Sequence, residues 1–222
     1  SPKGIKVGTK NLHGVLQNSG GSIMVRTKGR NGEGIESKGA ITISGGAVTV
    51  KAADDAINAA GNISFEGGHT YAYSSTNDGI DANGNLYMKG GVAIAFGGSG
   101  AESGIDTDER HSLSITGGYL FGIGGRVDSK FGSCTQAYGY TTSSASYSGK
   151  YIVLSQNSTP ICAFKMPASS YSGIALASTP EMKKSTTYTL GTSSSVEGDE
   201  TNGFVALKSA DSTTNKASFT AR

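Results

Sequence analysis

Hydrophobic and polar positions alternate along residues 1–132 in short segments that recur in a fixed order. In each repeat an isoleucine lies between a small residue and a polar or acidic one, and two alternating segments follow, separated by a glycine pair. The isoleucine marker occurs as Gly34-Ile35-Glu36, Ala56-Ile57-Asn58, Gly79-Ile80-Asp81 and Gly104-Ile105-Asp106, at intervals of 22, 23 and 25 residues. Alternation with a period of two predicts short β-strands that bury one face.

The glycine pairs keep step with this marker. They are Gly20-Gly21, Gly45-Gly46, Gly67-Gly68, Gly90-Gly91 and Gly117-Gly118. A unit of 22 to 25 residues with three short strands, three turns and no helical periodicity cannot bury its apolar residues alone, so successive units must stack. We therefore predict an all-β fold, a right-handed parallel β-helix whose coils lie about 4.8 Å apart. The asparagine-centred leucine pattern of a leucine-rich repeat is absent.

The second half of the chain has a different composition. Of the 34 glycines, 28 fall in residues 1–132, whereas three of the four prolines follow residue 159. Further apolar segments occur at 151–154, 161–164, 187–190 and 204–207. We predict β-helix coils over residues 1–132 and a C-terminal β-rich segment, residues 133–222, that packs against them and covers them.

Charge and hydropathy exclude several partners. The 19 basic and 17 acidic residues give a net charge of +2, with no run of Lys or Arg, so we expect no nucleic-acid partner. No apolar stretch approaches the roughly 18 residues of a membrane span, so we expect no transmembrane segment. The chain starts at Ser1 without a signal-like segment, which we interpret as a mature or truncated form, and we expect a monomer.

The two cysteines, Cys134 and Cys162, lack the spacing of a zinc or redox motif. Two interpretations remain open. They form one disulfide, as is common in secreted proteins, or they are two buried free thiols.

Stacking would bring acidic side chains of neighbouring coils together. Eleven of the 17 acidic residues lie between Glu33 and Glu109. Glu36, Asn58, Asp81 and Asp106 share the position after the isoleucine, and Asp55 and Asp78 share the position two before it. Stacked carboxylates repel one another, and calcium, which takes six to eight oxygen ligands, would relieve that repulsion. The alternative is that these residues serve turn geometry and face water.

A stripe of apolar side chains should point outward after the glycine pairs. Met24, Tyr71, Ile94 and Phe121 form one column, and Tyr73, Phe96 and Ile123 form the next. Such a stripe rarely faces water uncovered. Tyr71, Tyr73, Phe96 and Phe121 either form a platform on which sugar rings stack, or they lie beneath residues 133–222.

The stretches 34–46, 54–59 and 77–82 resemble the bacterial secreted carbohydrate-binding domain-containing proteins, and residues 164–167, 170–172, 178–181 and 187–190 resemble the C-terminal block of that family. The resemblance therefore extends over nearly the whole chain. It implies a pectate-lyase-like, calcium-binding, right-handed parallel β-helix that binds cellulosic or acidic, pectic polysaccharide outside the cell or on the bacterial cell surface. The implied metal ligands are Asp54, Asp55, Asp78 and Asp81, with Glu36 and Asp106 in the matching column. Ala56, Asn58 and Ser103 depart from the family's acidic motif, so the resemblance does not fix the number of ions.

Three functions follow from these observations. We expect a non-catalytic, calcium-binding polysaccharide-binding protein. The enzymatic alternative is a calcium-dependent lyase of uronate polymers, for which Lys51 and Arg110 are weak candidates as catalytic residues. The third function is that of a structural or adhesive protein of the cell surface.

Overall fold

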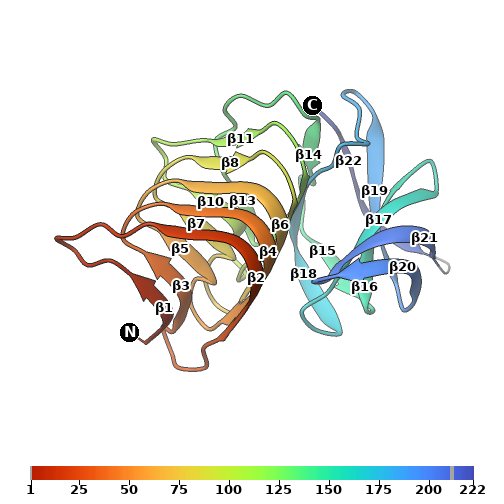
Figure 1. The fold of residues 1–222 in the computed structure, drawn as a ribbon. Helices are drawn as coiled ribbons and strands as arrows, with labels where there is room; N and C mark the ends of the chain where they lie inside the picture. Colours follow the sequence, from red (N-terminus) through yellow and green to blue (C-terminus); the bar gives the residue numbers. More distant parts are fainter. Residues whose placement is uncertain (1, 211–212) are drawn as a thin grey trace.

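The structure is a computed structural model that describes residues 2–210 and 213–222. These residues form 22 strands and no helix, so none of them belongs to a helix that could span a membrane. Figure 1 shows the first half of the chain wound into stacked coils, with a second β-structure beside them. The predicted all-β parallel β-helix is confirmed.

One face of the solenoid is a six-stranded parallel sheet, which we call the marker sheet because its strands carry the isoleucine markers. Its strands are, in spatial order, β1 (Lys3–Val7), β3 (Glu33–Ser37), β5 (Ile57–Ala59), β7 (Ile80–Ala82), β10 (Ser103–Thr107) and β13 (Arg126–Asp128). Ile35, Ile57, Ile80 and Ile105 pair in register and are at most 2% exposed. Their side chains form a continuous ladder in the core, and replacing one by Ala would cost about 2 to 5 kcal/mol of stability.

The rest of each coil forms the other large sheet of the solenoid. Its solenoid strands are β2 (Leu16–Arg26), β4 (Ile41–Ala52), β6 (Ile63–Ser74), β8 (Leu86–Met88), β9 (Val92–Phe96), β11 (Leu113–Ile115) and β12 (Tyr119–Gly124). The sequence predicts two short strands at each glycine pair, one before the pair and one after it. In β2, β4 and β6 these two strands are one bent strand, because the ladder continues through a register shift at the glycines.

The glycine pairs are required at these bends. The second glycine of each pair has a φ between 71° and 79°, a left-handed conformation that side chains with a Cβ rarely adopt. Space is also lacking, since a Cβ on Gly46 would lie 2.4 Å from the carbonyl oxygen of Gly21 on the preceding coil. The glycine excess of the first half therefore serves the close approach of one coil to the next.

The C-terminal half has two parts. The strands β14 (Tyr138–Tyr140), β15 (Ala145–Ser148) and β18 (Ser170–Ser178) attach to the solenoid. Strand β18 pairs antiparallel with β12, with Phe121 opposite Ala177, and so protects the last open edge of that sheet. The described strands of residues 133–222 therefore include some that extend the solenoid sheet itself.

The other part is a six-stranded antiparallel sheet, which we call the covering sheet. Its strands are, in spatial order, β20 (Val196–Thr201), β21 (Phe204–Ala210), β17 (Thr159–Lys165), β16 (Tyr151–Gln156), β19 (Thr187–Ser193) and β22 (Thr214–Thr220). It lies against the outward face of the solenoid, on the right in Figure 1. The rings of Phe121 and Phe164 stack across this junction at 4.4 Å.

The covering sheet decides the role of the apolar stripe. Tyr71, Phe96 and Phe121 are 6%, 0% and 1% exposed, and Tyr73 is half-buried. An open sugar platform made of these four residues is therefore wrong, because the covering sheet excludes water and ligand from three of the rings. Of the two interpretations of the stripe, the structure shows burial beneath the second half for these rings, whereas Met24 at the start of the stripe is 82% exposed.

The structure also decides between the two interpretations of the cysteines. Cys134 and Cys162 are both free thiols. Cys162 is buried in the core at the junction, whereas Cys134 is half-buried against the core of the solenoid. Because they belong to different cores, they form no disulfide.

Candidate functional site

Two columns of charged and polar side chains cross the marker sheet. The first follows strand pairing through Lys6, Glu36, Asn58, Asp81, Asp106 and Asp128. The second runs through Lys3, Glu33, Asp55, Asp78, Ser103 and Arg126. It lies three residues before the first column on each strand except the last, where a register shift reduces the offset to two. The predicted stacking of Asp55 on Asp78, and of Asp81 on Asp106, therefore occurs.

The N-terminal end of these columns is neutralised by lysines. Glu36 is buried and forms ion pairs with Lys38, with Lys6 at 3.4 Å and with Lys3 at 3.9 Å. Burial alone would raise the pKa of Glu36, but the hydrogen bond from Lys38 and the nearby lysine charges hold this pKa below its ordinary value. Glu36 therefore has no unmet charge to offer a metal ion.

In the middle of the columns, protein donors bind the carboxylates. Asn58 donates through its amide nitrogen to Asp55 at 2.8 Å and to Asp81 at 3.0 Å. The backbone N–H of Asp78 donates to Asp55 at 3.1 Å, and that of Ser103 donates to Asp78 at 2.5 Å. Apart from the bond between Asn58 and Asp55, which lies within one coil, these bonds connect each coil to the next, as the turn-geometry interpretation requires.

Asp54 belongs to the same group, because its carboxylate accepts a hydrogen bond from Asn77 at 2.8 Å. Its partner, like that of Asp55, lies on the following coil. Of the predicted metal ligands, Asp54, Asp55 and Asp78 thus act as hydrogen-bond acceptors between coils.

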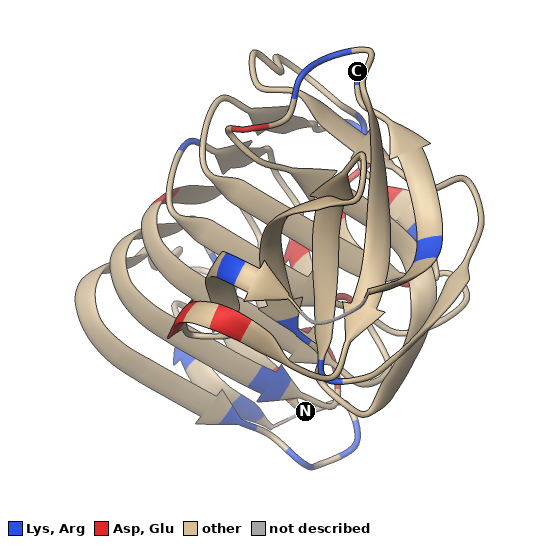
Figure 2. Ribbon diagram, turned by 90° about the vertical axis from the view of Figure 1, so that its right-hand side faces the viewer, with Lys and Arg blue, Asp and Glu red and all other residues tan. Residues whose placement is uncertain are grey.

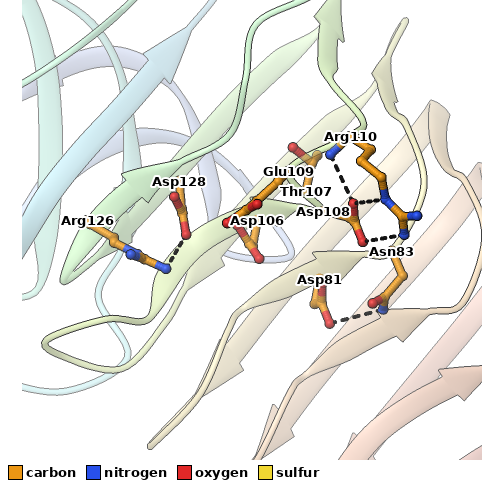
Figure 3. A pocket seen from close by; sticks show the side chains of 9 residues that line it. All are labelled: Asp81, Asn83, Asp106, Thr107, Asp108, Glu109, Arg110, Arg126 and Asp128. Carbon is orange, nitrogen blue, oxygen red and sulfur yellow. Dashed lines mark hydrogen bonds and ion pairs between the residues drawn. The ribbon is translucent and has the colours of Figure 1, made fainter.

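At the C-terminal end the columns open into a cleft of about 450 Å³, which we call the acidic cleft. Figure 3 shows Asp81, Asp106 and Asp128 along it, with Asp108 and Arg110 at one end. Arg126 is paired with Asp128 and Arg110 with Asp108. One oxygen of Asp106, Oδ1, is shielded from solvent and has no hydrogen-bond partner among the described residues.

Four aspartates of the columns hold their protons more tightly than free aspartates. Burial, with the charges of neighbouring acids, raises the pKa of Asp78 to about 8 and that of Asp81 to about 7. Burial raises the pKa of Asp55 to about 6, and burial together with the charge of Asp128 raises that of Asp106 to about 6. At neutral pH the fold therefore holds carboxyl groups whose ionised form is unfavourable unless a cation joins them.

The six predicted metal ligands do not converge on one centre. In the part of the chain that the structure describes, no three His, Cys, Asp or Glu side chains lie close enough together to hold a metal ion. Glu36 does not fit a metal, because lysines already surround it. Asp81 and Asp106 fit the donor chemistry of a hard divalent cation, since carboxylate oxygens line an open cleft and Asp106 Oδ1 lacks a donor.

A second polar region lies where the covering sheet meets the solenoid. It consists of three adjoining clefts of about 430, 250 and 350 Å³. Lys51 lines both the first and the second cleft, and Tyr73 and Ser75 line both the second and the third. We call these three clefts together the junction groove; residues of the covering sheet line the first of them. Arg26, Lys28 and Lys165 also line it, and all three are exposed, as is Lys51.

The floor of the junction groove is fixed by a β-turn between β20 and β21. Asn202 has a φ of 47° and donates to the carbonyl oxygens of Val48 at 3.0 Å and His69 at 2.7 Å. Its own side-chain oxygen accepts a hydrogen bond from Thr49 at 2.5 Å. The Tyr71 hydroxyl adds a bond to the carbonyl oxygen of Lys165 at 3.1 Å.

The coils beside this groove are the part of the chain with a known likeness. Residues 11–79 match a family model described as carbohydrate-binding domain-containing protein. The matched segment contains β2, β3, β4, β5 and β6, and with them Glu36, Asp54, Asp55 and Asp78, but it ends before Asp81 and Asp106. No curated protein and no solved structure matches the chain. The resemblance noted for residues 164–190 stays a prediction.

Some residues of these sites were missed from the sequence. The catalytic candidates Lys51 and Arg110 lie in different clefts, since Lys51 lines the junction groove and Arg110 lines the acidic cleft. Asp128 and Arg26 were not singled out from the sequence. The available signal for Arg26 was its position two residues after Met24, which is the spacing that relates Tyr73 to Tyr71 in the outward columns.

Proposed function

We propose that this chain is a non-catalytic carbohydrate-binding protein that acts outside the bacterial cell or on its surface. The observation that carries the proposal is the family match over residues 11–79, because the matched strands β2, β4 and β6 provide one wall of the junction groove. An open, polar groove lined by two half-buried tyrosines, Tyr73 and Tyr171, suits a sugar chain, which offers hydroxyl groups and flat apolar faces.

We also propose that calcium is part of the working protein and is held at the acidic cleft. Asp81 and Asp106 would hold it, with Asp128 nearby. Bound calcium would neutralise these carboxylates and offer free coordination positions to sugar hydroxyl or carboxylate oxygens. The raised pKa values of Asp81 and Asp106 and the unpartnered oxygen of Asp106 support this assignment.

The placement of the candidate catalytic residues favours a binding protein over a lyase. A lyase needs a base and a neutralising cation at one sugar unit. Lys51 and Arg110 line different clefts, and Arg110 is engaged by Asp108 at 3.2 Å. The third function, that of an adhesive surface protein, differs from that of a carbohydrate-binding protein in that it requires no defined glycan ligand.

The test is isothermal titration of the protein with cellulosic oligosaccharides and with oligogalacturonates, in calcium and in EDTA. We expect heat of binding to at least one of these glycans. Where the double variant Asp81→Asn/Asp106→Asn weakens binding of a glycan, we expect the intact protein to bind that glycan more tightly in calcium than in EDTA. The matched control is Asp199→Asn, which removes an exposed carboxylate from the covering sheet. Absence of binding to every glycan would overturn the proposal, and growth of the ultraviolet absorbance of unsaturated uronates would replace it with a lyase.

A further inference from the structure

The junction groove contains three cations, Arg26, Lys28 and Lys51, that have no ion-pair partner among the residues the structure describes. Arg26 and Lys51 lie directly opposite each other on the paired strands β2 and β4, and both are exposed. Like charges at opposed positions destabilise a sheet. Among the described residues, Arg26, Lys28 and Lys51 form no ion pair. The repulsion between them is therefore relieved only by solvent or by a bound anion.

The same outward column changes from basic to aromatic along the solenoid. Lys51 pairs in register with Tyr73, and Tyr73 with Phe96. Phe96 lies beneath the covering sheet, whereas Tyr73 is half-buried and Lys51 exposed, so the column emerges from the junction at these two residues. A positive charge beside a partly accessible ring is a combination that holds an acidic sugar, because the ring contacts the sugar face and the cation its carboxylate.

Figure 2 shows blue segments at the ends of neighbouring solenoid strands and along the loop near the N-terminus. On the opposite wall of the groove, Lys165 adds a cation that Glu200 contacts at 3.4 Å. Lys51 lines two of the clefts, Arg26 lines one of these two and Lys165 the other. A ligand that contacts all three cations must therefore extend over two clefts, as a chain of several sugar units does.

We propose that the junction groove binds an anionic polysaccharide, a carboxylate-bearing sugar chain, through Arg26 and Lys51 without a metal ion. This inference rests on the proposed carbohydrate binding and names a second ligand region, separate from the acidic cleft. A polynucleotide fits less well, because the whole chain carries a net charge of only +2 and the groove offers few cations for a phosphate at every unit. The matched family segment, residues 11–79, contains Arg26, Lys28, Lys51 and Tyr73.

The experiment compares Arg26→Gln/Lys51→Gln with the intact protein by titration of oligogalacturonate in EDTA. We expect binding by the intact protein without calcium, and affinity about 10-fold weaker in the double variant, since two solvent-exposed charge contacts are lost. Lys183→Gln/Lys184→Gln is the matched control, because it removes two exposed positive charges outside the groove. Salt should weaken binding by the intact protein, and methyl esterification of the ligand should reproduce the loss seen in the double variant.

Several outcomes would overturn the inference. If the intact protein binds oligogalacturonate and the groove variant binds it equally well, the groove is not the site, while the proposed carbohydrate binding survives. Equal losses in the groove and control variants would show a general charge effect. Preferential, Arg26-dependent binding of a single-stranded oligonucleotide or of anionic vesicles would replace the polysaccharide as the ligand. If the intact protein binds no glycan at all, both proposals fail together.

Discussion

The acidic columns and the junction groove both place like charges next to each other on neighbouring coils, but the two regions differ in how far these charges are buried. In both regions the solenoid stacks like charges on neighbouring coils, Asp81 on Asp106 in one and Arg26 on Lys51 in the other. Asp81 and Asp106 are half-buried, their pKa values are raised, and Asn58 of the preceding coil donates to Asp81. Arg26 and Lys51 are exposed and form no ion pair among the described residues. The charge state of the acids must therefore affect folding, and that of the cations only binding.

The largest expected effect is the response of the intact protein to pH in EDTA. The pKa of Asp78 is about 8 in the folded protein against an ordinary value of 3.8, and that of Asp81 is about 7. The folded state therefore binds more protons than the unfolded chain between about pH 4 and pH 8, and stability falls as pH rises through this window. We expect the melting temperature to drop by about 5 °C or more from pH 5 to pH 9.

Calcium should remove most of that pH response if the acidic cleft binds it. At about 100 times its dissociation constant, a ligand specific for the folded state adds about 2.7 kcal/mol of stability. The melting temperature at pH 9 should then rise by several degrees, measured by calorimetry with calcium and with magnesium as the control ion. If the melting temperature in EDTA does not change with pH, the raised pKa values are not coupled to folding. If calcium does not change the melting temperature, the acidic cleft does not bind calcium.

The second effect, in order of size, concerns the contact that forms the groove. Asn202→Gly keeps a residue that tolerates the φ of 47° but removes the side-chain bonds to Val48, His69 and Thr49. We expect a loss of about 2 kcal/mol in the free energy of unfolding, measured by denaturant titration. Glycan binding in the groove should weaken as well, while any effect of calcium on stability should persist.

Asn157→Gly is the control for this substitution. Asn157 has a φ of 48° in the turn between β16 and β17 and is exposed, with no side-chain hydrogen bond among those described. Its replacement should change stability by only a few tenths of a kcal/mol. If both variants lose the same stability, the cause is backbone entropy, and the bonds of Asn202 across the junction contribute nothing measurable.

The third effect is a gain in stability. Asp81→Asn removes one charge from the acidic column and leaves a side chain of the same shape that faces Asn58 and Asp106. In EDTA at pH 8 we expect the melting temperature to rise by about 2 to 4 °C, because the repulsion and the desolvation of a charge both disappear. The variant should gain less from calcium than the intact protein does. Destabilisation in EDTA would show that the hydrogen bond from Asn58 to the charged carboxylate outweighs repulsion.

The parts of the molecule that could be predicted from the sequence are those that follow from the repeat of 22 to 25 residues. The marker isoleucines, the glycine bends and the stacking of Asp55 on Asp78 follow from spacing alone, because each coil repeats the geometry of the one before. The sites depend instead on contacts between distant segments. No period relates Asn202 to Val48, or Lys165 to Lys51, so the junction groove could not be predicted. The cover over Phe96 and Phe121 could be stated only as one of two alternatives.

The smallest expected effect completes the contrast between the two regions. Arg26→Gln/Lys51→Gln should leave the melting temperature within about 1 °C of that of the intact protein, since both side chains are exposed and form no ion pair among the residues described. The measurement is calorimetry at low salt, where a repulsion between Arg26 and Lys51 is least screened. A small rise would measure that repulsion. A drop of several degrees would mean that the cations stabilise the fold, and their effect on glycan binding would then have to be separated from unfolding.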